Sequence, residues 1–224
     1  MPDFQLRMLV EQTLLVFAAL FPIVDPVGGA PVFLAMTHGL DDGQRRLLAR
    51  RIAINAFLLV LGAFFIGNSI IEFFGLSVPI IQVGGGLLVC SMAWKLLHTD
   101  SPDQVPVRPQ TKEELAVRAF YPMTMPLTVG PGAISVSITL GAQVPRGVLA
   151  YAIGIAGAVV GALLLAVSIY GLFGYAQRLT RALGTTGTAV LLRLSAFILL
   201  CIGVQIIWSG LFALIGTIPS FRAR

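Results

Sequence analysis

Charge is what this 224-residue chain has least of. Asp, Glu, Lys and Arg together make up 11% of the residues, whereas they make up about a quarter of a typical soluble domain. Hydrophobic residues make up 57%, and the mean hydropathy is +0.91. Because a surface so poor in charge would not stay dissolved in water, the composition excludes a soluble enzyme or binding domain. It predicts an integral membrane protein whose partner is the lipid bilayer.

Cysteine and histidine are equally scarce, with two residues of each. Cys90 and Cys201 lie inside apolar runs, where a thiol usually behaves as a small hydrophobe. They form neither a disulfide framework nor a metal signature. His38 and His98 lie near the ends of apolar runs, and we assign neither to a metal. We therefore expect no cofactor.

Catalytic signatures are missing from the apolar runs. The sequence contains no His-Glu-x-x-His pattern, Ser–His pair or P-loop, so neither zinc-dependent hydrolysis nor ATP-driven work is encoded in it. Between Glu11 and Asp41 the one formal charge is Asp25. Acid–base catalysis by carboxylates needs a second carboxylate at a workable distance. We therefore expect that the protein is not an enzyme.

Positive charge is present but is not arranged for nucleic acid. The formal net charge is +5 and the pI is about 9.8, yet no basic stripe with interleaved aromatic residues occurs. Eleven of the fifteen Lys and Arg residues fall in or next to the three longer connections between apolar runs. This is the positive-inside pattern, so we predict cytoplasmic longer loops, both termini outside and no nucleic-acid partner.

Six apolar segments are each long enough to cross a bilayer as a helix. They cover residues 11–37, 52–74, 78–97, 119–142, 148–175 and 189–214. The polar stretches 41–51 and 177–188 are expected to be connections between spans. The polar, proline-rich linker 98–118 separates a first three-helix repeat, 1–97, from a second, 119–224. The predicted fold class is an all-α membrane protein.

Two of these segments contain proline and glycine where a span should be an unbroken helix. Residues 21–31 read FPIVDPVGGAP, and residues 125–133 read MPLTVGPGA. A free backbone N–H or C=O is so unfavourable in lipid that such a break persists only where it lines a cavity walled by protein. In the first break we expect a helix to about Phe21, an unwound turn, and a half-helix from Pro26 to about Thr37.

The two halves of the chain match each other weakly. A shift of 111 residues sets Gln82 on Arg193 and Cys90 on Cys201, and a shift of 104 or 105 aligns the two breaks. Because each half has an odd number of spans, the second copy enters the membrane upside down. We therefore predict two inverted three-helix repeats with broken first and fourth helices, an arrangement typical of secondary transporters.

Three sets of residues resemble the MarC family of inner-membrane proteins. They are Asp25-Pro26-x-Gly28-x-x-Pro31 in the first span, Met125-Pro126-x-x-x-Gly130-Pro131-Gly132 in the fourth, and Arg193 with Gln205 in the sixth. The resemblance covers essentially the whole chain, although Ser195-Ala196 stands where the family pattern has Met-Gly. It implies a transporter-like, multi-pass protein of a bacterial inner membrane, with small neutral amino acids as the substrate class.

Each break is expected to start a half-helix whose N-terminus points toward the membrane centre. Asp25 and Gly130 occupy the N-cap position, and Pro26 and Pro131 occupy the first helical position, where no N–H is needed. Such an end carries about half a positive charge and binds anions. The Gly130 end has no acid and suits a carboxylate, whereas the Asp25 end suits an ammonium group, a proton or Na⁺.

The other candidate binding residues surround this predicted site. They combine glycines that let a ligand reach the backbone with polar side chains at matching positions of the two halves: Gly28, Gly29, Gly132, Thr128, Gln82 and Arg193. Each has a structural alternative. Asp25 is then only a helix cap, Thr128 donates a hydrogen bond between helices, and Arg193 reaches the cytoplasmic interface. Gly84-Gly85-Gly86 indicates tight helix packing rather than a site.

These patterns favour secondary transport. We expect alternating access for a small neutral amino acid or similar zwitterion, because no further acid or base lies at membrane depth to match a charged side chain. Na⁺ or H⁺ is the candidate coupling ion. The alternatives are a non-transporting membrane scaffold or regulator, in which the proline kinks are structural, and an intramembrane enzyme. The direction of transport and the oligomeric state stay open.

Overall fold

The computed structural model describes residues 2–37, 40–98, 117–144 and 147–215. Within these ranges the chain is helical and contains no strand, as predicted. In chain order the helices are α1 (Pro2–Val24), α2 (Pro26–Met36), α3 (Asp42–Phe73), α4 (Val78–His98), η1 (Ala119–Thr128), α6 (Pro131–Ala142), α7 (Val148–Gly174) and α8 (Ala176–Ile215). Residues 99–116, most of the predicted linker, lie outside the described ranges.

Within the described ranges, five helical segments are long and apolar enough to cross a membrane. They are Gln5–Leu34, Asp42–Gly67, Val78–Lys95, Val148–Gly174 and Thr186–Ile215. The predicted fourth span is not among them, because it consists of two short pieces, η1 and the apolar α6, and has no long unbroken run. An all-helical membrane protein is confirmed, whereas a count of six spans is not.

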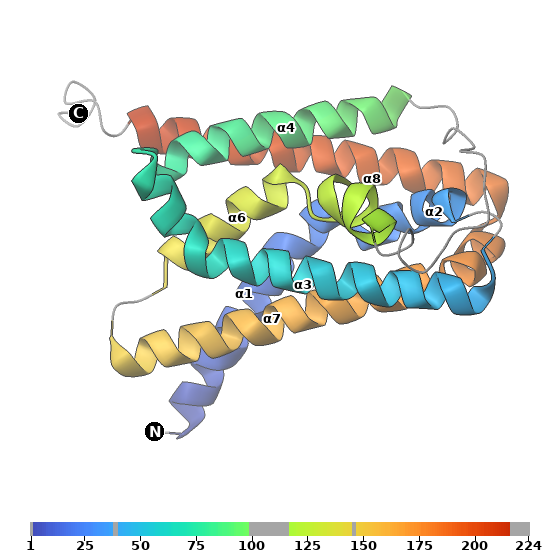
Figure 1. Cartoon of the computed structure of the whole chain (residues 1–224). Coiled ribbons are helices and arrows are strands. Elements are labelled where there is room, and N and C mark those ends of the chain that lie inside the picture. The colour runs from blue at the N-terminus through green and yellow to red at the C-terminus, as the bar shows by residue number, and fades with distance from the viewer. Residues whose placement is uncertain (1, 38–39, 99–116, 145–146, 216–224) are drawn as a thin grey trace.

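Two pairs of long helices flank α2, η1 and α6, whereas α1 crosses α7 and its N-terminal part extends beyond it (Figure 1). On one side α4 runs along α8, and on the other side α3 packs against α7. Between the pairs, α1 contacts α7, α2 contacts α8, and α6 contacts both α3 and α4. The broken helices therefore bridge the two pairs and carry much of the buried core, including Leu20, Phe33 and Ala133.

Glycines occupy the closest helix crossings. A Cβ added to Gly161 of α7 would lie 2.9 Å from the carbonyl oxygen of Thr13 on α1. One added to Gly86 of α4 would lie 2.8 Å from the carbonyl oxygen of Gly203 on α8. Small residues allow such close backbone contact between membrane helices. The packing role predicted for Gly84-Gly85-Gly86 is confirmed for Gly86, whereas a Cβ on Gly84 would meet nothing within 4 Å.

α3 begins ten residues before the predicted second span. Asp41 and Gln44 form a capping box: Gln44 N donates to Asp41 Oδ1 at 2.7 Å, and Asp41 N donates to Gln44 Oε1 at 3.2 Å. This arrangement satisfies two N–H groups that a helix start would otherwise leave free. The prediction that residues 41–51 form a polar connection is therefore wrong, since an Asp-x-x-Gln box starts the helix there.

α8 also begins earlier than predicted. The stretch 177–188, expected to be a basic loop, is helical from Ala176 onward and is interrupted at Gly184. Gly184 has a φ of +67°, in the left-handed region that glycine adopts without a steric penalty. The loop prediction is wrong because the chain needs only this one glycine to turn from a short basic helix into the last span.

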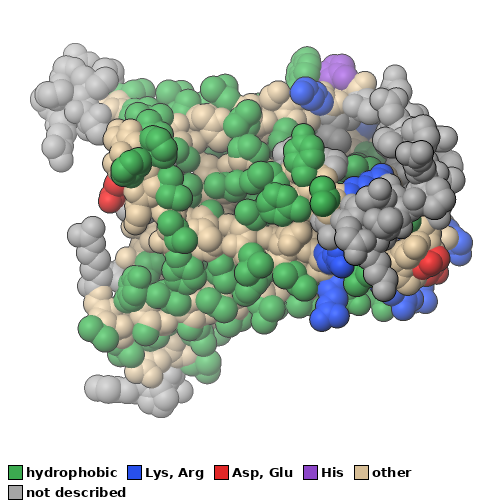
Figure 2. Space-filling view, viewed as in Figure 1, with side chains coloured by type: hydrophobic (Ala, Val, Ile, Leu, Met, Phe, Trp, Pro, Cys, Tyr) green, Lys and Arg blue, Asp and Glu red, His purple; other side chains and the backbone are tan. Residues whose placement is uncertain are grey.

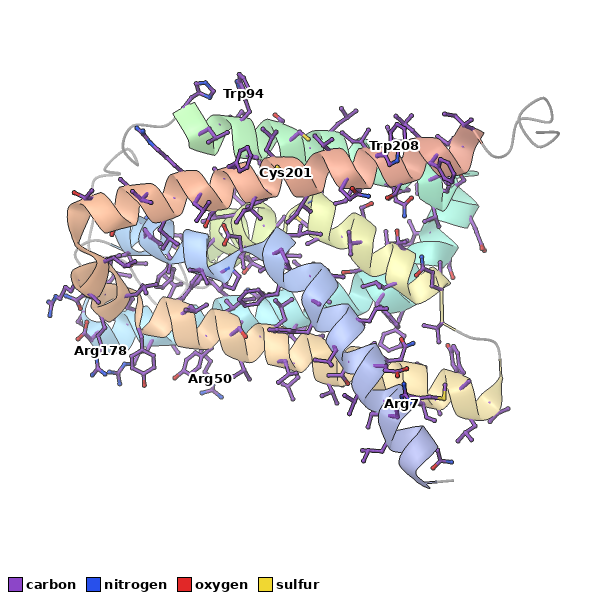
Figure 3. All side chains as sticks on the ribbon, turned by 180° about the vertical axis from the view of Figure 1, so that it is seen from behind. Arg7, Arg50, Trp94, Arg178, Cys201 and Trp208 are labelled. Atoms are coloured by element: carbon purple, nitrogen blue, oxygen red, sulfur yellow. The ribbon has the colours of Figure 1, made fainter. Side chains whose placement is uncertain are left out.

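Basic and tryptophan side chains are distributed unevenly along the length of the helix bundle. Figure 2 shows Lys and Arg side chains gathered at one end of the visible face. In Figure 3, Arg50 and Arg178 lie toward the end opposite to Arg7. Trp94 and Trp208, 59% and 62% exposed, lie toward opposite ends of the α4–α8 pair. Two separated tryptophan levels are typical of the two interfaces of a membrane.

Candidate binding site

The first break consists of a single residue, Asp25. Its N–H donates to the Phe21 carbonyl at 2.9 Å and its own carbonyl accepts from Gly29 N at 2.9 Å, so the ladders of α1 and α2 both reach it. Its φ of +42° is left-handed, a conformation that Asp adopts more readily than most residues with a Cβ. The predicted unwound turn after Phe21 is therefore wrong, because α1 continues to Val24 and one left-handed residue redirects the chain.

Asp25 caps α2, as predicted. The Gly28 N–H donates to Asp25 Oδ1 at 3.0 Å, and Pro26, the first residue of α2, has no N–H to satisfy. From α8, the Ser195 hydroxyl donates a second hydrogen bond to the carboxylate. A Cβ on Gly28 would overlap Asp25 Oδ2 and lie 2.7 Å from Ser195 Oγ. α2 and α8 therefore meet closely at this carboxylate.

Contacts along α2 and just beyond its C-terminal end hold the helix in place. The Phe33 ring stacks on Phe173 of α7 with the ring centroids 4.8 Å apart. Arg118 Nη2 donates to the Met36 carbonyl at 2.7 Å, and a buried guanidinium, that of Arg45, donates from Nη2 to the Thr37 carbonyl at 3.4 Å. Positive charge at a helix C-terminus complements its dipole. These contacts fix the helix whose N-terminus Asp25 caps.

The second break has no acid. η1 is an irregular segment of wide π-type turns, and Gly130 (φ −83°, ψ 177°) leads from it into α6 at Pro131. Within the described chain, no side chain caps this N-terminus. The first-turn N–H groups of Gly132 and Ala133 therefore lack a capping side chain. This agrees with the prediction of a half-helix starting at Pro131 with an unoccupied N-terminus.

Both breaks open onto one cavity of about 230 Å³. Six of the predicted site residues line it, three from each break: Asp25, Gly28, Gly29, Thr128, Gly130 and Gly132. The tertiary structure thus brings together two motifs that are far apart in the sequence. The Thr128 hydroxyl already donates to the Met123 carbonyl at 2.7 Å inside η1, so its bond is local rather than between helices.

α4 and α8 form the opposite wall of the cavity. α4 contributes Val89, Met92 and Lys95, and α8 contributes Leu192, Ser195, Ala196 and Leu199, spaced as one face of a helix. Sequence reasoning missed Ser195 and Lys95 as site residues, although the period of the α8 residues could have indicated Ser195. Lys95, whose side chain is exposed, adds a cation to the lining of the cavity.

Four of the predicted residues lie outside the set that lines the cavity. Pro26 and Pro131 start α2 and α6. Gln82 lies about two helical turns before Val89 on α4 and donates to Thr139 Oγ1 of α6 at 3.3 Å. Arg193 is exposed beside the cavity-lining face of α8 rather than on it. The expectation that Gln82 and Arg193 face the cavity is thus not met, because Gln82 lies too far along α4 and Arg193 lies on another face of α8.

The residues of both breaks and of the cavity wall fall within one region that matches a known protein family. A family model described as "MarC family integral membrane protein" matches residues 10–215, a range that contains both breaks and the cavity wall. The chain belongs to the MarC family. The family resemblance seen in the two breaks is therefore confirmed.

Relatives of this MarC chain occur in several organisms. The membrane protein YhcE of Escherichia coli is 31% identical over 198 residues, which cover 87% of this chain and 89% of that protein. A membrane protein of Archaeoglobus fulgidus is 30% identical over 196 residues, covering 87% and 90%. The inner membrane protein MarC of Salmonella typhimurium is 28% identical over 206 residues, covering 88% and 93%. No solved structure gives a significant match.

Membership of the MarC family makes this chain an integral membrane protein. The names of its relatives state a membrane location and, for some, an inner membrane, but no substrate or reaction. The chemistry of the MarC cavity therefore has to follow from the residues that line it.

Proposed function

We propose that this protein is a secondary transporter that moves a small neutral amino acid, or a similar zwitterion, across a bacterial inner membrane by alternating access. The observation that carries the proposal is the single cavity shared by two helix breaks, one capped by a carboxylate and the other uncapped. Helix breaks at membrane depth persist where they line a cavity, and paired breaks are typical of transporter binding sites.

The two breaks offer opposite charges to a solute. At the second break the first-turn N–H groups of Gly132 and Ala133 point out of a helix end that carries about half a positive charge, which suits a carboxylate. At the first break the Asp25 carboxylate suits an ammonium group. A hydrogen bond to a charged group contributes about 1.5–3 kcal/mol, so both ends together favour a zwitterion over a neutral solute.

Asp25 is also the candidate site for a coupling ion. It is the one carboxylate among the described residues that line the cavity, and an ionisable group at membrane depth is a functional candidate. A proton or Na⁺ would bind to the Asp25 carboxylate. It would either alternate with the substrate ammonium group or bind at the same time. No other cofactor is needed, because alternating access requires only that the two breaks be exposed to each side in succession.

We further propose two inverted three-helix repeats. Helix packing supports this, because exchanging the halves returns the most extensive helix contacts, although the lesser α1–α8 and α7–α8 contacts have no counterpart of similar extent. The α4–α8 and α3–α7 pairs map onto themselves, α2–α8 maps onto α6–α4, and α1–α7 maps onto η1–α3. Rocking of one such repeat against the other is the expected route to alternating access.

A non-transporting scaffold is the alternative, and an intramembrane enzyme is a weaker one. A scaffold needs no cavity between its proline breaks, although kinks at proline also occur in structural helices. An enzyme that uses carboxylates for acid–base catalysis needs two of them, whereas Asp25 stands without a second one among the described cavity residues. We therefore propose a carrier without catalytic activity.

The expected orientation has its own test. The described ends at Pro2 and Ile215 lie at the same end of the bundle, which supports an even number of crossings (Figure 1). We expect a reporter that is active only outside the cytoplasm to be active when fused after Arg224. The same reporter inserted in the linker 98–118 should be silent. The opposite pattern would reverse the proposed orientation.

Transport itself is tested with purified protein in liposomes. Labelled glycine, alanine, valine and leucine are offered with and without a Na⁺ or H⁺ gradient, beside labelled lysine and aspartate. We expect protein-dependent flux for neutral amino acids and little for charged ones, with protein-free liposomes as the control. No protein-dependent flux for any of them would favour the scaffold.

A further inference from the structure

Two arginines lie around one exposed tyrosine at the basic end of the bundle. Tyr175 directly follows α7 and is 51% exposed. The guanidinium carbon of Arg178 lies 5.2 Å from the centre of the Tyr175 ring, and that of Arg46 on α3 lies 6.0 Å from it. Both distances are within the range of cation–π attraction. The ring therefore holds together two positive charges that come from different helices.

Neither of these guanidinium groups forms a salt bridge within the described ranges. The acids closest to Arg46 in sequence contact other residues. Asp41 caps α3, and Asp42 Oδ1 accepts from Arg45 Nη1 at 3.0 Å. Two like charges beside one ring repel each other, so an anion that contacts both would be attracted to this surface. The pair of arginines is thus a candidate anion site that no side chain of the described chain fills.

This surface lies at the depth of lipid headgroups. α3 has 32 residues, so it is about 48 Å long, whereas the hydrocarbon core of a bilayer is about 30 Å thick. Its first turns, which carry Arg46 and Arg50, therefore extend beyond the hydrocarbon. Further along the same ridge α3 exposes Ile54 and Leu58. The surface changes from guanidinium to aliphatic in the same order as a phospholipid changes from phosphate to acyl chain.

The chemistry of arginine favours phosphate as the anion. A planar guanidinium presents paired N–H donors that match the oxygens of a phosphate group. A soluble phosphate would gain only these polar contacts. A lipid would also bury part of its acyl chains against Ile54 and Leu58, and apolar burial is favourable. The combination of both surfaces therefore favours a lipid over a soluble anion.

We infer that Arg46, Arg178 and the Tyr175 ring bind the phosphate of an anionic membrane lipid such as phosphatidylglycerol. Arg50, one turn further along α3, adds a third cation beside the lipid. None of these residues lines the cavity between the two breaks, so the inference does not depend on the proposed transport. A lipid bound here would contact α3 and the start of α8 together and stabilise the fold.

Binding is measured as the rise in the midpoint of thermal unfolding when lipid is added to the detergent-purified full-length protein. Phosphatidylglycerol is compared with phosphatidylcholine of the same chain length and with glycerol phosphate. We expect a clear rise with phosphatidylglycerol and little with the other two. An equal rise with phosphatidylcholine would mean that the negative charge is not recognised, and an equal rise with glycerol phosphate would mean a soluble ligand. Either result would overturn the inference.

A double variant locates the site. Arg46→Gln combined with Arg178→Gln removes both cations, and each arginine near an anionic lipid contributes about fivefold in affinity, so binding should weaken about thirtyfold. Arg7→Gln is the matched control, because Arg7 is an exposed arginine toward the opposite end of the bundle (Figure 3). We expect the control to bind phosphatidylglycerol like the wild type. Unchanged affinity in the folded double variant would show that the lipid does not bind here.

Substitutions of Tyr175 give a second test that leaves the charge unchanged. Tyr175→Phe keeps an aromatic face for both guanidinium groups, so it should bind phosphatidylglycerol like the wild type. Tyr175→Leu removes that face, so the two arginines are no longer held together and affinity should fall about fivefold. Equal affinity in the leucine and phenylalanine variants would contradict the role of the ring in the site.

Discussion

Replacing Asp25 with asparagine is expected to reduce amino acid flux about ten- to a hundredfold while the protein stays folded. Asp25 places the one negative charge of the described cavity residues at the first break. A hydrogen bond to a charged group contributes about 1.5–3 kcal/mol, and each 1.4 kcal/mol is about a factor of ten. Removing the charge therefore weakens the binding of a substrate ammonium group, and it also removes the site for a coupling proton or Na⁺.

Asparagine is the informative replacement because Asp25 also has a structural role. Its side chain accepts from Gly28 N at 3.0 Å, and its backbone has a φ of +42°. Asparagine caps helices about as well as aspartate and also tolerates the left-handed region. Asp25→Ala loses both properties and is expected to lower the free energy of unfolding by about 1–3 kcal/mol, so its flux would be harder to interpret.

The measurement is flux into liposomes over a range of external pH, at matched amounts of folded protein. Asp41→Asn is the matched control, because Asp41 caps α3 with the same kind of hydrogen bond but is exposed and outside the cavity. We expect Asp41→Asn to transport like the wild type. If Asp25→Asn also keeps its flux and the wild-type pH dependence, Asp25 is a helix cap and nothing more.

Gly141→Ala is expected to destabilise the protein strongly, although it adds only one methyl group. Gly141 lies on α6 where it crosses α3, and a Cβ there would overlap the carbonyl oxygen of Phe64 and lie 3.0 Å from its carbonyl carbon. Both are backbone atoms, so the two helices must move apart. Overpacking of a core costs about 1–3 kcal/mol even where side chains can adjust, so we expect the upper end of this range or more.

The effect is measured as the midpoint of thermal unfolding in detergent. A loss of about 3 kcal/mol corresponds to a decrease of roughly 6–12 °C for a chain of this size. Gly62→Ala on α3 is the control, because a Cβ there would meet nothing within 4 Å and alanine is the better helix former. A Gly141→Ala midpoint equal to that of the control would mean that α3 and α6 do not cross so closely.

The helix starts at the two breaks were predictable because the relevant chemistry is local. Asp25-Pro26 and Gly130-Pro131 combine an N-cap residue with a proline in the first helical position, and both helices begin there. The start of α3 is just as local, at Asp41-x-x-Gln44, but the arginines that follow it are also typical of a polar loop. The capping box that starts α3 can therefore be recognised in the sequence. The prediction missed it because the charged residues of this segment suggested a polar connection instead.

The extent of the breaks was not predictable in the same way. Proline and glycine over residues 21–31 suggested several unwound residues, whereas only Asp25 leaves the helix. The break is this short because residues from elsewhere in the chain contact it. Ser195 of α8 donates a hydrogen bond to the Asp25 carboxylate, and the stack of Phe33 on Phe173 holds α2 in place. Neither contact has a signature in the sequence near the break.

By itself, the sequence determined that this is a helical membrane protein of the MarC family with two interrupted spans, because composition and helix-start chemistry depend on neighbouring residues. The tertiary structure alone decided that both interruptions border one cavity, that Lys95 and Ser195 line it, and that Gln82 and Arg193 do not. The reason is that helix crossings, such as that of Gly86 with Gly203, set which faces of α4 and α8 turn inward.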